Sequence, residues 1–241
     1  AFTTVLLASL VEHRGWHPAP AMLLTLGLGT GFGAIMGLMI QRYRLPPFVV
    51  TLAGMFLARG AATLVSVESI GIEHGFQTAL AALRLPLGGG AALSAAAVAA
   101  VVVVVAGAVV ARGTQFGRTV YAIGGSEQSA ILMGLPVPAT QVAVYALSGF
   151  CAALGGVLYS VSTLSGYSLH ATGLELDAIA AVVIGGTLLS GGSGRVVGTL
   201  FGVLLLGQIQ TLIAFDGSLS SWWTRIIVGA LLLVFCLLQR L

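Results

Sequence analysis

The chain has 241 residues, of which ten are Lys or Arg and seven are Asp or Glu. Charged residues make up 7% of it, against about 25% in soluble domains, and 58% of its residues are hydrophobic. This composition excludes intrinsic disorder and a single soluble globule, and it predicts a polytopic membrane protein. All ten basic residues are arginine, so these residues contain neither a P-loop lysine nor a Schiff-base lysine.

Apolar segments follow one another along the chain. The first run, 1–11, is shorter than the about 20 residues of a spanning helix, so we expect the chain to begin inside a helix and to lack an N-terminal part. Among the remaining apolar segments, 175–191 is the shortest and is rich in glycine, which is typical of a broken or re-entrant helix. Seven spans are expected, at 18–40, 46–66, 91–111, 139–160, 175–191, 197–215 and 222–240. They predict an all-α polytopic membrane helix bundle that forms one transmembrane domain over 1–241.

The positions of the charges predict how this bundle is oriented. The connecting segments on one side of the expected spans carry six arginines and one acid, Glu127. The segments on the other side carry two arginines and four acids. Short cytoplasmic segments of membrane proteins are rich in Lys and Arg, so the first side should be cytoplasmic. Its arginines are Arg42, Arg44, Arg112, Arg118, Arg195 and Arg240.

The longest segment on the arginine-rich side is 112–138, and it is amphipathic rather than apolar. Ser126 is a good N-cap for a short helix over 127–133, with Glu127 in the first turn. Gly134 and Pro136 should end that helix.

Four ionisable residues lie in or near the expected spans. Arg59 lies about thirteen residues into its span, where both a structural ion pair and the lining of a polar pathway are open interpretations. Glu175 and Asp177 stand at the start of a span, where carboxylates also stabilise a helix N-terminus. Because they are two residues apart, they should point to different faces of a helix, which disfavours a paired-carboxylate catalytic site. The fourth residue is Arg225.

Catalytic and metal-binding patterns are not apparent in the sequence. No nucleophile-elbow or zinc-protease motif is present. Glu12, His13 and His17 have metal-ligand chemistry, but Gly15 and Pro18 interrupt any helix there, so a solvated outer loop is favoured. We therefore expect no enzyme activity, no cofactor and no metal.

Several blocks of sequence resemble a known family. The block G-R-T-V-Y-A-I-G-G-S-E-Q-S-A-I-L-M-G at 117–134 is similar to the cytoplasmic coupling segment of bacterial ABC sugar-importer permeases of the ribose/xylose/galactose type. The blocks at 45–60, 173–194 and 215–224 resemble the same family in the same order. The last of these, together with V-S-V-E-S-I-G-I-E-H at 65–74, looks most like the galactofuranose importer permease.

This resemblance implies a permease subunit of the bacterial inner membrane that imports a monosaccharide. It implies as partners a separate ABC ATPase, a periplasmic sugar-binding protein, a second permease subunit, like or unlike this one, and the lipid bilayer, with no nucleic acid. The family usually has an earlier stretch of the type S-G-G-I-D-L-S-V-G, which these residues lack. The residues that the resemblance assigns to ATPase coupling are Gly117, Arg118, Tyr121, Gly124, Gly125, Ser126, Glu127 and Gly134.

A sugar pathway needs hydrogen-bonding groups and aromatic faces. Each candidate also has a simpler interpretation as a packing residue or a membrane anchor. The alternative function, an ion-gradient-driven secondary transporter, predicts acids in the middle of spans, and the expected spans contain few. The pathway candidates are Thr51, Arg59, Tyr167, Glu175, Asp177, Gln208, Gln210 and Trp222.

Overall fold

A computed structural model describes residues 1–88, 91–189, 191–216 and 221–238 of the chain, with the side chains of 87, 88, 91, 216, 221, 222, 224 and 238 left out of the description. The chain divides into two compact units. Unit 1 comprises 1–101 and 138–170, and unit 2 comprises 102–137 and 171–241. Each unit is described by itself below.

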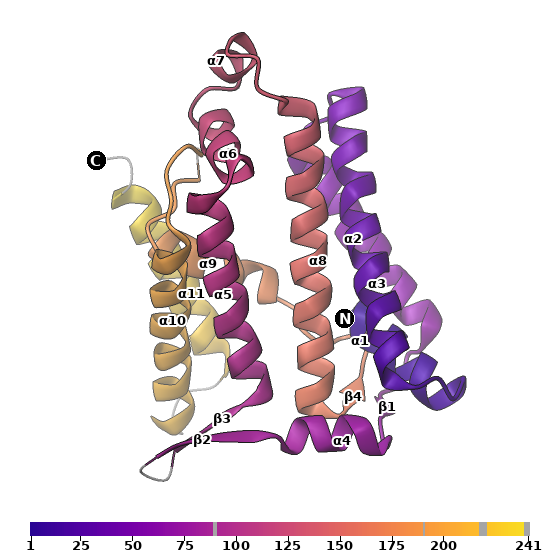
Figure 1. Ribbon diagram of the computed structural model, residues 1–241. Coiled ribbons are helices and arrows are strands. Elements are labelled where there is room, and N and C mark those ends of the chain that lie inside the picture. Colours follow the sequence, from indigo (N-terminus) through magenta and orange to yellow (C-terminus); the bar gives the residue numbers. More distant parts are fainter. Residues whose placement is uncertain (89–90, 190, 217–220, 239–241) are drawn as a thin grey trace. The chain divides into compact units, whose positions relative to one another are not determined.

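Unit 1 is built on long apolar helices. These are α2 (Pro18–Tyr43), α3 (Pro47–Val65) and α8 (Val137–Thr163), which enters the unit at Pro138 (Figure 1). The ring of His17 caps the start of α2 by accepting a hydrogen bond from the Ala19 N–H, and Arg44 ends it in the left-handed conformation, at φ 51°. At about 1.5 Å per residue, the 26 residues of α2 exceed the roughly 30 Å of a bilayer core.

Glycines of α2 bring its backbone against α8. A methyl group added at Gly29 would lie 2.5 Å from the Ala153 Cβ, and one added at Gly33 would meet the carbonyl of Tyr145. Small residues allow such close helix contacts in lipid. The stripe at Gly29, Gly33 and Gly37 is therefore a packing surface, as the spacing of these residues suggests.

The remaining elements of unit 1 are short. The chain starts with α1 (Phe2–Ala8) and a π-helix (Ser9–His13), whose side chains form a small core with Ile70, Ile72 and others. Strand β1 (Ile70–Gly71) pairs with β4 (Ser165–Gly166), and α4 (Gly75–Ala82) follows β1. Strands β2 (Arg84–Gly88) and β3 (Ala91–Ser94) form an antiparallel hairpin before α5. The carboxylate of Glu12 accepts a 2.7 Å hydrogen bond from the Glu73 N–H. This bond connects the π-helix to the segment between β1 and α4.

Unit 2 contains the end of α5 (Ala95–Gly113), α6 (Gln115–Gly125), α7 (Glu127–Leu132), α9 (Leu174–Ile184), α10 (Val196–Asp216) and α11 (Ser221–Leu238). Helix α9 packs against both α10 and α11. Ala180 and Ala181 of α9, Leu206 of α10 and Val228 of α11 are the buried core of this contact.

The all-α class is confirmed, and each expected span overlaps a helix. Among the described residues, five helices are long and apolar enough to cross a membrane, namely α2, α3, α5, α8 and α10. The expected span at 91–111 begins late, because β3 occupies its first residues. The expected span at 175–191 is helical only to Ile184. The helix that it contains, α9, has 11 residues and a length of about 16 Å. The number of spans stays a prediction.

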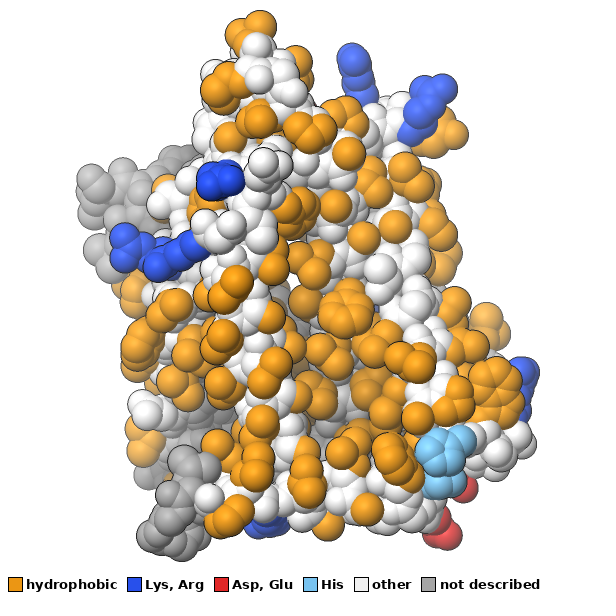
Figure 2. All heavy atoms as spheres, in the orientation of Figure 1, with side chains coloured by type: hydrophobic (Ala, Val, Ile, Leu, Met, Phe, Trp, Pro, Cys, Tyr) orange, Lys and Arg blue, Asp and Glu red, His pale blue; other side chains and the backbone are white. Residues whose placement is uncertain are grey.

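The surface of the long helices is apolar. Figure 2 shows hydrophobic side chains over much of the visible surface of the long helices, with few charged side chains among them. Exposed leucines, valines and phenylalanines occur along α2, α3, α5 and α10. This distribution is that of helices whose solvent is lipid.

Candidate coupling segment and polar residues of the helices

The 112–138 segment forms two short helices, α6 and α7, joined at Ser126. The Thr114 hydroxyl caps α6 by accepting from the Gly117 N–H at 3.2 Å. The Ser126 Oγ caps α7 in the same way, accepting from the Ser129 N–H at 3.2 Å. Gly134 follows with a left-handed φ of 74°. The predicted short helix and its N-cap are confirmed, with an end at Leu132 instead of 133.

The end of α7 presents apolar side chains to the surroundings. Ile131, Leu132 and Met133 are 57%, 88% and 65% exposed. Glu127, at the start of the same helix, is exposed as well. A charged, capped helix that ends in uncovered apolar residues is typical of a surface that another protein covers.

The C-terminal end of α6 lies against the connection between α9 and α10. The Tyr121 hydroxyl donates a 2.8 Å hydrogen bond to the Gly194 carbonyl. A methyl group added at Gly124 would lie 2.6 Å from the Gly192 nitrogen, so the two backbones touch. The sequence assigned Tyr121 and Gly124 to the coupling segment, but nothing in it indicated these partners.

Of the other expected coupling residues, one glycine is buried at a helix bend, and the remaining residues are exposed. Gly117 is buried, and a methyl group there would meet the Ala111 carbonyl at the bend between α5 and α6. Gly125 is exposed, and a methyl group there would meet nothing within 4 Å. Arg118 is exposed on α6. Of the two adjacent glycines, only Gly124 is thus required by a close approach.

Three pathway candidates lie in unit 1. The Thr51 hydroxyl donates to the Pro47 carbonyl of its own helix at 2.9 Å. Arg59 is half-buried on α3. The ring of Tyr167 lies edge-on to that of His170, with centroids 5.6 Å apart, and burial lowers the pKa of that histidine.

Four further candidates lie in unit 2. The Glu175 carboxylate accepts from the Gly173 N–H at 3.2 Å, next to the start of α9. The Asp177 carboxylate accepts from the Gln210 side-chain amide at 3.4 Å and so links α9 to α10. The two acids therefore have different partners, in agreement with the expectation that they point to different faces. The side chain of the eighth candidate, Trp222, lies outside the described residues.

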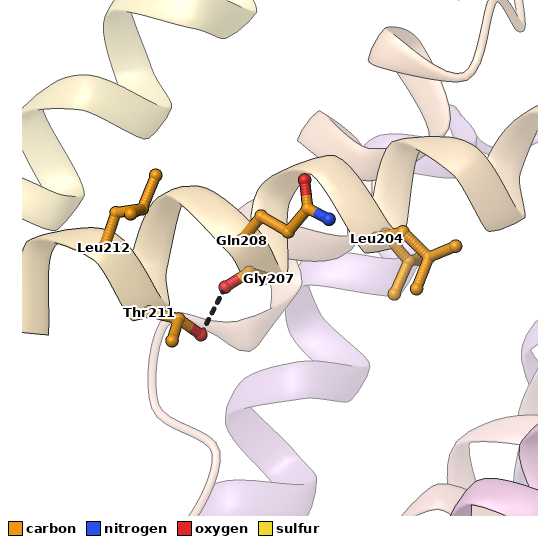
Figure 3. A pocket seen from close by; sticks show the side chains of 6 residues that line it. Leu204, Gly207, Gln208, Thr211 and Leu212 are labelled. Atoms are coloured by element: carbon orange, nitrogen blue, oxygen red, sulfur yellow. Dashed lines mark hydrogen bonds between the residues drawn. The ribbon is translucent and has the colours of Figure 1, made fainter. Parts of the chain in front are cut away.

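Gln208 belongs to an open groove on one face of α10. Figure 3 shows its amide between Leu204 and Thr211, whose hydroxyl donates a 2.7 Å hydrogen bond to the Gly207 carbonyl. The groove is lined by Val203, Leu204, Gly207, Gln208, Thr211 and Leu212. Gln210 faces α9, so the two glutamines of α10 serve different surfaces.

The part of the chain that the structure describes contains no group of three or more His, Cys, Asp or Glu residues that could hold a metal ion. Glu12 instead binds the Glu73 backbone. His17 packs its ring on His74 and Phe76, with centroids 5.3 Å away in both cases.

Long apolar helices and a short, capped, amphipathic segment between them define a multi-pass membrane protein of the transport class. Residues 1–236 match the family described as branched-chain amino acid transport system / permease component, and the chain belongs to this family. It is accordingly a transport permease component and not an enzyme. The ion-gradient-driven alternative is not favoured by this membership.

The chain is similar to several characterised permeases. It is 51% identical over 240 residues to the inner membrane ABC transporter permease protein YjfF of Escherichia coli (strain K12), covering 100% of this chain and 72% of the relative. It is 39% identical to the fructose import permease protein FruG of Bifidobacterium longum (strain NCC 2705), covering 91% of this chain and 66% of the relative. It is 35% identical to the ribose import permease protein RbsC of Bacillus subtilis (strain 168), covering 100% and 73%. No solved structure matches the chain significantly.

These findings confirm an ABC importer permease of the sugar type. They also confirm a multi-pass protein of the inner membrane, in agreement with the apolar helices. The family works in general with an ATPase and a binding protein.

Proposed function

We propose that this chain is the membrane-spanning permease domain, over 1–241, of an ABC importer that carries a monosaccharide, with galactofuranose as the substrate. The observation that carries the proposal is the end of α7. Ile131, Leu132 and Met133 are exposed there, on a segment whose arginines predict a cytoplasmic location. These residues contain no lysine for a P-loop, which is compatible with ATP hydrolysis on a partner subunit.

The partner that fits this surface is the ABC ATPase. Apolar side chains at the tip of a capped helix suit a hydrophobic groove in another protein. Glu127 at the start of α7 and Arg118 on α6 are exposed charges of opposite sign, which would help to orient the docking. The second permease subunit and the sugar-binding protein complete the proposed assembly.

The substrate proposal rests on the blocks at 65–74 and 215–224. Two of the relatives named above are a fructose and a ribose import permease, so all three sugars belong in one uptake assay. Vesicles that hold the importer and its binding protein should accumulate labelled galactofuranose in preference to ribose and fructose. Preferred uptake of either other sugar would correct the substrate and leave the class intact.

The docking proposal is tested by Leu132→Glu. The side chain is 88% exposed, so the change should leave the fold intact and should weaken retention of the ATPase about ten-fold or more, because a desolvated charge would enter an apolar contact. The measurement is co-purification of a co-expressed ABC ATPase subunit with the tagged chain.

A matched control is Leu83→Glu, which places the same charge at an exposed leucine after α4 and should retain the ATPase fully. Wild-type retention by Leu132→Glu would show that α7 is not the docking site. If the unaltered chain retained no ATPase, the proposed function itself would be wrong.

A further inference from the structure

The connection between α9 and α10 has a shape that glycines impose. We call the described residues of this connection, 185–189 and 191–195, the glycine loop. Gly186, Gly191 and Gly192 have φ values of 83°, 91° and 77°, a region that ordinary side chains rarely adopt. The Leu188 N–H donates to the Ser193 carbonyl at 3.0 Å and closes the loop. The loop is therefore a tight, specified turn.

One end of this turn is attached to α6. Gly124 approaches the Gly192 backbone so closely that an added methyl group would lie 2.6 Å from the nitrogen and 3.1 Å from the Cα. A methyl group added at Gly191 would in turn lie 3.0 Å from the Gly124 carbonyl oxygen. The Tyr121 hydroxyl adds its 2.8 Å bond to the Gly194 carbonyl, one helical turn before Gly124. Helix α6 and the loop are thus in direct backbone contact, with a hydrogen bond beside it.

The other end of the turn is continuous with α9 and α10. A methyl group at Gly198 would meet the Gly185 carbonyl, and one at Gly202 would meet the Ala181 carbonyl. Since α9 and α10 pack backbone against backbone, one cannot slide on the other without a clash. The Asp177–Gln210 bond continues the same antiparallel register farther along the two helices.

We propose that the glycine loop transmits movement from the coupling segment to α9 and α10, and that Tyr121 is the positioning residue that holds the loop to α6. The inference rests on the proposed function, because it takes α7 as the place where an ATPase acts. A displacement of α7 passes through Ser126 to α6, and contacts without intervening side chains carry it to the loop. Close-packed contacts of this kind switch between discrete arrangements instead of yielding gradually.

The test follows the loop directly in the assembled importer. A spin label is attached at Ser193→Cys, an exposed loop position, in a chain in which Cys151 and Cys236 are replaced by alanine. The complex with its ATPase is placed in lipid nanodiscs, and the label's mobility is compared with and without a non-hydrolysable ATP analogue. In the unaltered background the mobility should change when the analogue binds.

Two variants break the attachment to different degrees. Tyr121→Phe removes only the hydroxyl and should reduce the population of the nucleotide-dependent state about three- to ten-fold, the range for one lost hydrogen bond. Gly124→Ala forces the backbones apart and should abolish the response. Gly229→Ala on α11 is the control, because its methyl group meets nothing within 4 Å, and it should respond like the unaltered background.

The outcomes separate the inference from the proposed function. Equal responses in all variants, or no response in the background with the ATPase bound, would overturn the loop as transmitter and leave the docking of α7 standing. Loss of the response in Tyr121→Phe with the ATPase still retained supports it. If the ATPase were not retained by the unaltered chain, the proposed function would fail first. Should Gly124→Ala not fold, Tyr121→Phe decides alone.

Discussion

Two of the glycine contacts in the molecule obey the same packing rule but join different kinds of helix. In unit 1, Gly33 of α2 meets the Tyr145 carbonyl of α8, and in unit 2, Gly198 of α10 meets the Gly185 carbonyl at the end of α9. Helices α2 and α8 have 26 and 27 residues, whereas α9 has 11 and runs directly into the glycine loop. A contact between two long helices holds them in a fixed arrangement. When a short helix that runs into a turn makes the same contact, the helix can move together with that turn.

The largest expected effect comes from filling the contact between the long helices. Gly33→Ala should lower the free energy of unfolding by about 1–3 kcal/mol or more, because the added methyl group meets backbone that cannot rotate away. Thermal unfolding of the purified chain in detergent measures it. Gly31→Ala, on the same helix with nothing within 4 Å, should be neutral or should gain up to about 1 kcal/mol from helix propensity. Equal melting temperatures for the two variants would contradict the α2–α8 contact.

Filling the corresponding contact in unit 2 should affect transport more than stability. Gly198→Ala should cost about 1 kcal/mol, at the lower end of overpacking effects, because the short α9 and its loop can move away from α10 together without the two helices sliding past each other. Sugar uptake per folded molecule should nevertheless fall several-fold, since α9 and α10 would no longer keep their register. Gly207→Ala, which meets nothing within 4 Å on α10, is the control for both measurements. If uptake falls only in proportion to the amount of folded protein, the contact in unit 2 affects stability alone, and the proposed difference between the two contacts is wrong.

Most of the fold follows from local signals in the sequence. Apolar runs of spanning length predicted α2, α3, α5, α8 and α10, and the Ser126 cap with Gly134 predicted α7. The boundaries that differ involve backbone pairing or glycine. Hairpin β2–β3 delays α5 to Ala95, and Gly185 and Gly186 stop α9 at Ile184. Hydropathy predicts neither the late start of α5 nor the early end of α9, because alanine and glycine are also compatible with an apolar span.

The partners within the candidate site could not be predicted in the same way. Tyr121 and Gly194 are 73 residues apart, and their hydrogen bond depends on how α6 meets the glycine loop. Gly124 and Gly125 are adjacent and equivalent in the sequence, yet a methyl group would meet another backbone only at Gly124. Asp177 and Gln210 were both candidates on chemical grounds, and only the antiparallel register of α9 and α10 joins them.

The smallest expected effect concerns that polar link in unit 2. Asp177→Asn keeps a side-chain oxygen that can accept from the Gln210 amide and removes only the charge, so the free energy of unfolding should change by less than about 0.5 kcal/mol. Asp177→Ala leaves the amide without this acceptor and should cost about 0.5–1.5 kcal/mol. Parallel thermal unfolding of the two variants makes the comparison, with uptake as the second measurement. If Asn unfolds as easily as Ala, the carboxylate charge and not the hydrogen bond holds α9 to α10. If Asn instead keeps the stability but loses uptake, Asp177 acts on the transported sugar, and α9 is a wall of the pathway as well as a moving part.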